Sequence, residues 1–301
     1  RLHFLSKMLK GRSLLRVNKS ILGQLASRVA LFSTGQDEEP SRALKEGNVE
    51  IDGHNIHYDY CGTGRHALLL LPGAMGSSVT DFMPQLQNMN RDIFTMYAWD
   101  PPGYGKSRPP EREWPEHFLG RDADVAGALM QKLGIEKYSV LGWSDGGITG
   151  LMVAARNPEK VKKLVVWGCN AYVDPTDVPL LEVIKDIDKW SERMRQPFIE
   201  VYGPEYFAKH WKLWYESYIG YDSKRDGNIC KGELKNIACP TLIIHGQKDP
   251  IVPQFHPDYL HANIKNSQLV NWPEGKHNLH LRYFKEFNSL VESFLVTKSS
   301  L

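Results

Sequence analysis

The sequence predicts an α/β fold built on a mostly parallel, eight-stranded sheet with helices on both faces. From Val49 onward, short apolar runs alternate with helical stretches, which is the pattern of parallel strands joined by crossover helices. The runs are continuously apolar rather than alternating, which indicates strands covered on both faces. The chain has 301 residues, of which 42% are hydrophobic and 24% charged, so it can bury the core of one large domain or two small ones.

The expected strands fall into two groups. The first two flank Asp52-Gly53, a dipeptide typical of a hairpin turn. The six that follow are separated by longer stretches, as parallel strands must be. Strands are expected at residues 49–51, 56–60, 67–71, 94–99, 138–141, 163–167, 241–244 and 268–272, and helical periodicity occurs near 118–133, 148–156 and 284–295.

Residues 171–236 interrupt the alternation. They are helix-like, and they contain 11 of the 32 aromatic residues in about a fifth of the chain. Because the sheet pattern resumes directly afterwards, we expect an inserted helical lid rather than an extra pair of core helices, which leaves 46–170 and 237–298 as the core. Candidate aromatic residues for covering a substrate are Trp190, Trp211, Trp214 and Tyr218.

The first 36 residues differ in composition from the rest. They contain seven basic and no acidic side chains, and apolar residues recur among them at roughly helical spacing. This composition predicts a mitochondrial transit peptide, with a disordered basic tail as the alternative, and Met8 is a candidate initiator. We therefore expect a mitochondrial location.

Composition also excludes several classes of protein. Outside the leader, 30 basic and 35 acidic residues give a charge of about −5, which argues against a nucleic-acid partner. The longest aliphatic run, Ala67–Leu71, is far shorter than the ~20 residues of a membrane span. The four cysteines are widely spaced and predict neither a zinc site nor a disulfide framework. We expect a monomer that acts on a small molecule.

Gly142-Trp-Ser-Asp-Gly146 is the strongest catalytic signal. It follows an expected strand and precedes an expected helix, the context in which a serine is held in a strained, exposed turn. Glycines stand two positions before and two positions after Ser144 because the backbone folds back tightly on itself there. The motif alone arises often by chance, so its position after a buried strand is the informative part. Ser144 is the candidate nucleophile.

A serine hydroxyl needs a base, and the base needs an acid that orients it. Asp249 lies just beyond the strand at 241–244, and His277 lies in the loop after the last strand. Functional groups gather at such strand ends in open α/β sheets. Ser144, Asp249 and His277 follow the chain order of one known triad arrangement, although a turn-initiating Asp249 and an ordinary loop histidine are the structural alternatives. His280 beside His277 suggests a metal pair, but no third ligand accompanies them.

The negative charge that develops on a substrate carbonyl needs backbone N–H donors. The first expected donor is the amide of Asp145, directly after the nucleophile. The second is the amide of Ala74, with Met75 as the alternative, in the glycine-rich turn that ends the strand at 67–71. Another turn, Asp100–Ser107, fails the spacing of a phosphate-binding loop, since Asp stands where Gly is required. We expect no metal or other cofactor.

These motifs resemble the α/β-hydrolases, and within them the biphenyl hydrolase-like, or valacyclovir hydrolase, family. The resemblance runs from about residue 48 to the C-terminus. It is strongest in Leu70–Ser77, Ala98–Pro110, Leu141–Thr149, Trp190–Arg193, Asp226–Cys230, His245–Pro253 and Pro273–Arg282. There are two departures: Pro102 replaces an expected arginine, and Ala74-Met75 replaces an expected Met-Leu pair.

The resemblance implies a mitochondrial serine hydrolase whose triad is Ser144, Asp249 and His277. It also implies that Asp145 binds the substrate's α-amino group, so that the substrates are amino-acid esters, including prodrugs such as valacyclovir. From the residues alone, Asp145 has an equally good structural explanation, since an acid at a helix start is favoured by ~0.3–1 kcal/mol. The alternative functions are a carbon–carbon bond hydrolase of ring-cleavage products and a protein that binds a small ligand without catalysis.

Overall fold

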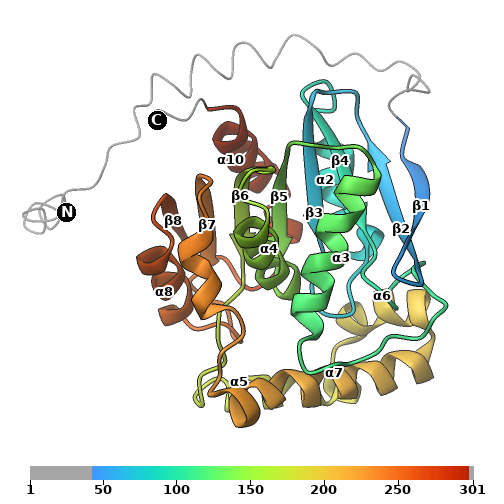
Figure 1. Ribbon diagram of the computed structural model, residues 1–301. Coiled ribbons are helices and arrows are strands. Elements are labelled where there is room, and N and C mark those ends of the chain that lie inside the picture. The colour runs from blue at the N-terminus through green and yellow to red at the C-terminus, as the bar shows by residue number, and fades with distance from the viewer. Residues whose placement is uncertain (1–42, 298–301) are drawn as a thin grey trace, which may run out of the picture. The chain divides into compact units, whose positions relative to one another are not determined.

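The fold is an eight-stranded sheet with helices on both faces, as the sequence predicts (Figure 1). The computed structural model describes residues 43–297, so the leader predicted for residues 1–36 lies outside the described residues. Strand order is β1-β2-β4-β3-β5-β6-β7-β8. The strands are β1 (Lys45–Ile51), β2 (His54–Cys61), β3 (His66–Leu71), β4 (Phe94–Trp99), β5 (Tyr138–Trp143), β6 (Val161–Trp167), β7 (Thr241–Gly246) and β8 (Ser267–Trp272).

Strand direction matches the two groups expected from the sequence. β1 and β2 form the antiparallel hairpin around Asp52-Gly53, and β2 also runs antiparallel to β4. All neighbours from β4 to β8 pair in parallel. The carboxyl ends of these six strands therefore meet at one edge of the sheet, where the candidate site residues follow.

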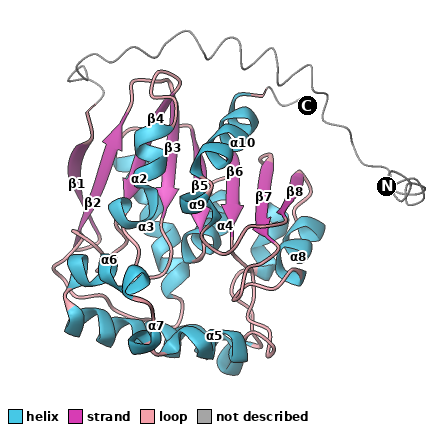
Figure 2. Cartoon of the chain, turned by 180° about the vertical axis from the view of Figure 1, so that it is seen from behind, coloured by secondary structure: helices cyan, strands magenta, loops and turns pink. Residues whose placement is uncertain are grey.

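The continuous apolar runs are explained by a core on each side of the sheet. In β3, Leu69 and Leu71 pack into one core with α3 (Phe118–Lys132) and α4 (Asp145–Arg156), and α8 (Phe255–Asn263) covers the same face near β7 and β8. Leu68 and Leu70 point to the opposite core. That core is covered by α2 (Ser78–Asn88), α9 (Leu279–Arg282) and α10 (Phe284–Val296), as Figures 1 and 2 show.

The last strand departs from the expectation of cover on both faces. β8 has a single strand neighbour, and its side chains are half-buried or exposed along its length. An outer strand packs against fewer residues than a central one, whatever its hydrophobicity. Its apolar run therefore predicted the strand but not its degree of burial.

The segment after β6 is helical, and it lies across the carboxyl ends of the parallel strands (Figure 2). It contains α5 (Val178–Lys185), the 3-10 helix η1 (Ile187–Lys189), α6 (Glu192–Tyr202), α7 (Pro204–Arg225) and the 3-10 helix η2 (Lys231–Asn236). The final piece, η2, packs on α4, where Glu233 pairs with Arg156 at 2.8 Å. Of these elements, α5, α6 and α7 are the ones that cover the sheet edge.

Within residues 43–297, no helix combines the length and apolar character that a membrane crossing requires.

Candidate active site

Ser144 sits in a sharp turn between β5 and α4. Its backbone has φ 55° and ψ −123°, a conformation that L-residues rarely adopt and that costs of order 1–3 kcal/mol. The turn leaves no room for side chains on either side, because a Cβ on Gly142 would lie 2.2 Å from the Gly146 carbonyl oxygen. A Cβ on Gly146 would lie 2.0 Å from the Leu71 carbonyl oxygen. The glycines of the motif are therefore required by the packing of the turn.

The structure brings the three predicted triad side chains together from three different loops. His277 Nε2 lies 3.1 Å from Ser144 Oγ, and His277 Nδ1 lies 2.8 Å from Asp249 Oδ2. Because a carboxylate only accepts, Nδ1 carries the hydrogen of this bond and Nε2 is left as the acceptor facing the hydroxyl. This is the arrangement in which an imidazole can take a proton from serine.

Asp249 is held as a carboxylate. Burial opposes its ionisation, but the neighbouring His277 lowers the pKa of the Asp249 carboxyl below its ordinary value, and so do two backbone amides. These amides belong to Ile251 and Val252, which donate to Asp249 Oδ1 over 3.0 and 3.1 Å. One carboxylate oxygen is thus used by the loop itself, and the other is directed at His277.

The turn after β3 lies directly against the nucleophile. Its Gly73 amide donates to Asp81 Oδ2 over 2.8 Å, and a Cβ on Gly73 would lie 3.3 Å from the Ser144 Cβ. Among the hydrogen bonds within residues 43–297, none uses the amide of Ala74 or of Asp145 as donor. The two amides that the sequence nominates for the oxyanion are therefore uncommitted. Met75, the alternative, is buried with φ 55°.

The Asp145 side chain is buried beside the nucleophile and points toward the helical insertion. It is 7% exposed, and its Oδ2 accepts a 2.7 Å hydrogen bond from Trp214 Nε1 in α7. Burial raises the pKa of the Asp145 carboxyl to about 7, against the opposing effects of Trp214 and of the Arg112 guanidinium. Asp145 is therefore a carboxyl group in a site that disfavours its negative charge, a condition typical of functional positions.

A pocket opens at Ser144 between the sheet edge and the helical insertion. Its lining combines the nucleophile, His277 and Asp145 with apolar side chains and with further polar side chains that come from other elements. Its lining residues are Ser144, Asp145, Ile148, Gly168, Asn170, Asp177, Leu181, Trp214, Tyr218, Ile251, Val252, His256 and His277. Concave sites of this kind, mostly apolar with a few placed polar groups, bind small molecules.

Two of the four candidate aromatic residues reach this pocket. Trp214 and Tyr218 line it, whereas Trp190 and Trp211 pack on each other with ring centroids 4.7 Å apart. Both of the latter donate their indole N–H to the Ile184 carbonyl oxygen. Trp190 and Trp211 therefore pack within the insertion and are not among the residues that line the pocket.

His280 has a structural role and does not form a metal pair with His277. It is fully buried, its Nδ1 accepts from Trp167 Nε1 over 2.9 Å, and its Nε2 donates to the Asp81 carbonyl oxygen over 3.1 Å. Burial lowers the pKa of His280 to about 3. Both ring nitrogens are thus committed to neighbours, and the ring stays neutral.

Sequence reasoning missed Trp143, Asp177 and His256. Trp143 is the first of the two variable positions in the motif, and its Nε1 donates to the His277 carbonyl oxygen over 2.9 Å. Asp177 and His256 pair at 2.8 Å in the pocket, although 79 positions separate them in the chain. No local pattern signals such a pair, since only the packing of the insertion on α8 brings the two together.

The Asp100–Ser107 turn does not line the pocket at Ser144, but hydrogen bonds connect it to neighbouring elements. Asp100 accepts from the Ser78 and Lys106 amides over 2.8 and 2.7 Å, and the Pro102 carbonyl oxygen accepts from Arg112. Pro102, which stands in place of the expected arginine, therefore meets the buried Arg112 through its backbone. The neighbouring Tyr104 lines a small cavity behind Asp145.

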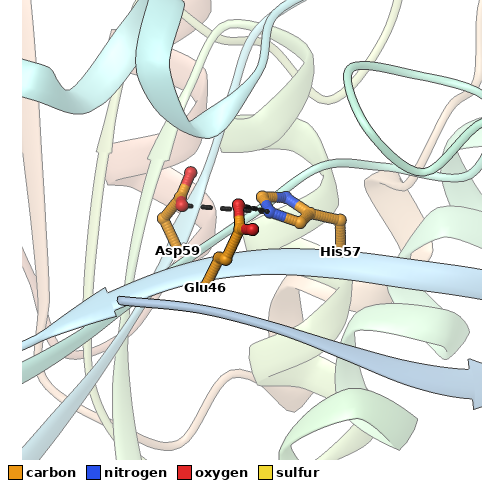
Figure 3. A group of neighbouring side chains, drawn as sticks. All are labelled: Glu46, His57 and Asp59. Carbon is orange, nitrogen blue, oxygen red and sulfur yellow. Dashed lines mark ion pairs between the residues drawn. The ribbon is translucent and has the colours of Figure 1, made fainter. Parts of the chain in front are cut away.

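Glu46, His57 and Asp59 lie close together on the β1–β2 hairpin, with both carboxylates facing His57 Nε2 from the same side (Figure 3). The distances from Nε2 are 3.5 Å to Glu46 and 3.9 Å to Asp59. Lys106 forms an ion pair with the same Glu46 oxygen. Because an ammonium group already occupies this position, we interpret the group as an ion-pair network that joins the hairpin to the Asp100 turn.

Comparison with known proteins agrees with this geometry. Residues 66–211 match the model of the alpha/beta hydrolase fold family. The chain is 47% identical to human serine hydrolase BPHL over 288 residues, which cover 96% of this chain and 99% of the relative. The chain belongs to the α/β-hydrolase family, in the branch of serine hydrolase BPHL. It is a serine hydrolase. The mouse relative of the same name is also 47% identical, over 91% of this chain and 94% of the relative.

Solved structures show the same fold at much lower identity. An α/β-hydrolase from a Medee basin deep-sea metagenome library superposes with a TM-score of 0.70 at 20% identity, covering 84% of this chain and 98% of that one. The 2-hydroxy-6-oxo-6-phenylhexa-2,4-dienoate hydrolase of Rhodococcus sp. strain RHA1 superposes with a TM-score of 0.66 at 24% identity, over 84% and 99%. The family model ends before Asp249 and His277, so the distances above are what place these two residues in this serine hydrolase's site.

Proposed function

We propose that this serine hydrolase cleaves esters of α-amino acids through an acyl-enzyme on Ser144. The observation that carries the proposal is the position of Asp145, a buried carboxylate next to the nucleophile that lines the same pocket. An ammonium group at contact distance from a poorly solvated carboxylate is strongly attracted to it. Amino-acid esters carry such a group one carbon away from the scissile carbonyl.

The chemistry begins with proton transfer from Ser144 Oγ to His277 Nε2, across the 3.1 Å hydrogen bond. The Ser144 oxygen attacks the ester carbonyl, while Asp249 stabilises the imidazolium that forms. The amides of Ala74 and Asp145 hold the oxyanion. His277 then protonates the departing alcohol. Water, deprotonated by His277, attacks the acyl-enzyme and releases the amino acid, which restores Ser144.

The raised pKa of Asp145 fits the binding of a cation. The Trp214 N–H and the Arg112 guanidinium offset only part of the effect of burial, which raises the pKa of the Asp145 carboxyl to about 7. A bound ammonium would supply a full counter-charge and favour the ionised form. Among amino-acid esters, the resemblance to valacyclovir hydrolases favours prodrugs in which valine is esterified to the primary alcohol of a drug.

A ring-cleavage hydrolase is the competing enzyme class. A Pseudomonas putida relative named 2-hydroxy-6-oxononadienedioate/2-hydroxy-6-oxononatrienedioate hydrolase 1 is 26% identical over 280 residues. A dioate carries two carboxylates, whereas the described residues that line the pocket include Asp145 and Asp177 and no Arg or Lys. Like charges at short range disfavour such a substrate here.

The test compares valine methyl ester, its N-acetylated form and a ring-cleavage dienoate, using wild type, Ser144→Ala and Asp145→Asn. We expect kcat/KM for the free amino ester to exceed that for the acetylated ester by at least about a hundredfold, because removing one partner of a buried charge pair costs ~3 kcal/mol or more. Asp145→Asn should remove most of this difference and keep the hydrogen bond from Trp214.

Asp188→Asn is the control, since Asp188 is an exposed aspartate of the helical insertion that does not line the pocket. It should leave the ratio between free and acetylated esters unchanged. Equal turnover of the two esters by wild type would reject the hypothesis that Asp145 binds the amino group, but it would not affect the assignment as a serine hydrolase. Unchanged hydrolysis by Ser144→Ala would show that Ser144 is not the nucleophile. If the protein only binds a small ligand without catalysis, no form of the chain should turn over any of the substrates.

Mitochondrial import directed by residues 1–36 is a separate proposal, supported by the acid-free, basic composition of that segment. A fusion of these residues to a fluorescent protein should localise to mitochondria. Replacing the seven basic side chains with glutamine should leave the fusion in the cytosol, and mitochondrial signal from the glutamine variant would contradict the proposal.

A further inference from the structure

The pocket has a second polar end, formed by Asp177 and His256. Asp177 stands at the start of α5 and His256 in the first turn of α8, and the two are 3% and 1% exposed. Asp177 Oδ2 accepts from His256 Nε2 over 2.8 Å and from the Asp174 amide over 2.7 Å. One oxygen of the carboxylate is thus held in place by two donors from different elements.

The other oxygen has no partner. Within the described residues, Asp177 Oδ1 and His256 Nδ1 are buried without any hydrogen bond. A buried polar atom left unpaired costs about 1–3 kcal/mol, and such atoms are few in folded proteins. Asn170 and Tyr218 line the same pocket but donate to other atoms: the Tyr218 hydroxyl donates to Asn170 Oδ1 at 2.9 Å, and the Asn170 side-chain NH₂ donates to the Tyr172 carbonyl oxygen.

The unpaired Asp177 oxygen requires a donor, because a carboxylate oxygen only accepts. His256 contacts the other oxygen through Nε2, so its Nδ1 faces away from the carboxylate. We propose that Asp177 Oδ1 forms a subsite for a hydrogen-bond donor, such as a hydroxyl or a protonated amine, carried by the alcohol part of the ester. This inference rests on the proposed function and adds to it a preference for polar leaving alcohols.

The position of the subsite relative to the triad assigns it to the alcohol. Ile251 and Val252, which line the pocket with His256, also donate their amides to Asp249, the partner of His277. The subsite therefore adjoins the loop that holds the Asp249–His277 pair. His277 must protonate the leaving oxygen, so the alcohol extends on this side. Asp145, in contrast, follows Ser144 and meets the amino group of the acyl part.

The experiment uses the full chain and three valine esters whose alcohol parts are equally long: hydroxypropyl, which offers a terminal donor, butyl, which is apolar, and methoxyethyl, which only accepts. We expect wild type to prefer hydroxypropyl over butyl by about tenfold or more in kcat/KM, since a hydrogen bond to a charged group contributes ~1.5–3 kcal/mol. This comparison requires no variant. A ratio near one would overturn the proposal.

Asp177→Asn provides a sharper second test. The two donors that face Oδ2 would hold the amide oxygen of the substituted side chain, which turns its NH₂ group toward the pocket and replaces an acceptor with a donor. The preference should therefore shift from hydroxypropyl toward methoxyethyl. Because each ratio is measured within one variant, a general loss of activity cancels. Asp188→Asn, an exposed control in the same insertion and outside the pocket, should keep the wild-type ratio.

Two further outcomes separate this inference from the proposed function. Threonine butyl ester carries a hydroxyl in the acyl part that valine butyl ester lacks. If wild type prefers the threonine ester but does not prefer hydroxypropyl over butyl among the valine esters, the subsite serves the acyl part and the assignment to the alcohol is overturned. An Asp177→Asn ratio identical to wild type would overturn the role of Asp177. Failure of wild type to hydrolyse any of the valine esters would instead reject the proposed function.

Discussion

The indole N–H of Trp143 donates a 2.9 Å hydrogen bond to the carbonyl oxygen of His277. The residue directly before the nucleophile therefore fixes the backbone of the residue that activates it. Their rings are also in contact, with centroids 5.3 Å apart. Since Ser144 and His277 come from opposite halves of the chain, this bond joins the nucleophile turn directly to the loop that carries His277.

Trp143→Phe should lower kcat by about tenfold with little change in KM, because a small misplacement of a base weakens proton transfer more than binding. The measurement is steady-state hydrolysis of a valine ester. Trp272→Phe is the control, since Trp272 stacks on Tyr283 and does not line the pocket. A parallel rise in KM would show that Trp143 contributes to binding instead of positioning.

The strained backbone at Ser144 predicts a difference between two inactive variants. Ser144→Ala and Ser144→Gly both remove the nucleophile, and each should lose at least about a thousandfold in kcat. Glycine adopts φ 55° without strain, so the free energy of unfolding in urea should be about 1 kcal/mol higher for Ser144→Gly than for Ser144→Ala. Equal stability of the two would show that the turn stores no strain.

Asp145 should make the protein less stable as pH rises. Its folded pKa of about 7 lies above the ordinary value of 3.8, so its contribution is present at low pH and is lost as pH rises through 7. Asp145→Asn removes this dependence, and its Tm near neutral or mildly alkaline pH should exceed that of wild type by at least about 2 °C. Thermal melts across this pH range test the prediction. An Asp145→Asn variant that is less stable than wild type in this range would contradict the raised pKa of Asp145.

His280 should have the opposite pH dependence. Its folded pKa of about 3 lies below the ordinary value of 6.5, so the stability it contributes is present above 6.5 and is lost as pH falls toward 3. His280→Phe leaves the Trp167 N–H unpaired and should cost about 1–3 kcal/mol at neutral pH. The gap to wild type should narrow on acidification in urea titrations, and a constant gap would reject this explanation.

Gly146 should not tolerate a methyl group. In Gly146→Ala the new Cβ would lie 2.0 Å from the Leu71 carbonyl oxygen, which is backbone and cannot rotate away. We expect a loss of at least about 2 kcal/mol in stability together with a loss of activity. Gly232→Ala, where no atom lies within 4 Å of the added Cβ, should change stability by less than about 0.5 kcal/mol. Similar Tm values for the two variants would show that the turn has room for a methyl group at position 146.

Local sequence patterns were sufficient to predict the sheet, the turn at Ser144 and the chain order of Ser144, Asp249 and His277. These patterns are continuous apolar runs, small residues at a tight turn and polar residues at strand ends. The helical character of the segment after β6 was likewise readable, because its aromatic and helical periodicity interrupts the alternation.

Which distant side chains share the pocket depends on the folded chain instead. Asp177 pairs with His256 and Trp143 with His277 through contacts 79 and 134 positions apart, which no periodicity encodes. Folding also separates Trp214 and Tyr218, which meet the pocket, from Trp190 and Trp211, which do not. The hydrophobic effect favours the burial of every one of these aromatic residues, so hydrophobicity alone does not show which of them line the pocket. The packing of α5 and α7 on the sheet edge decides this.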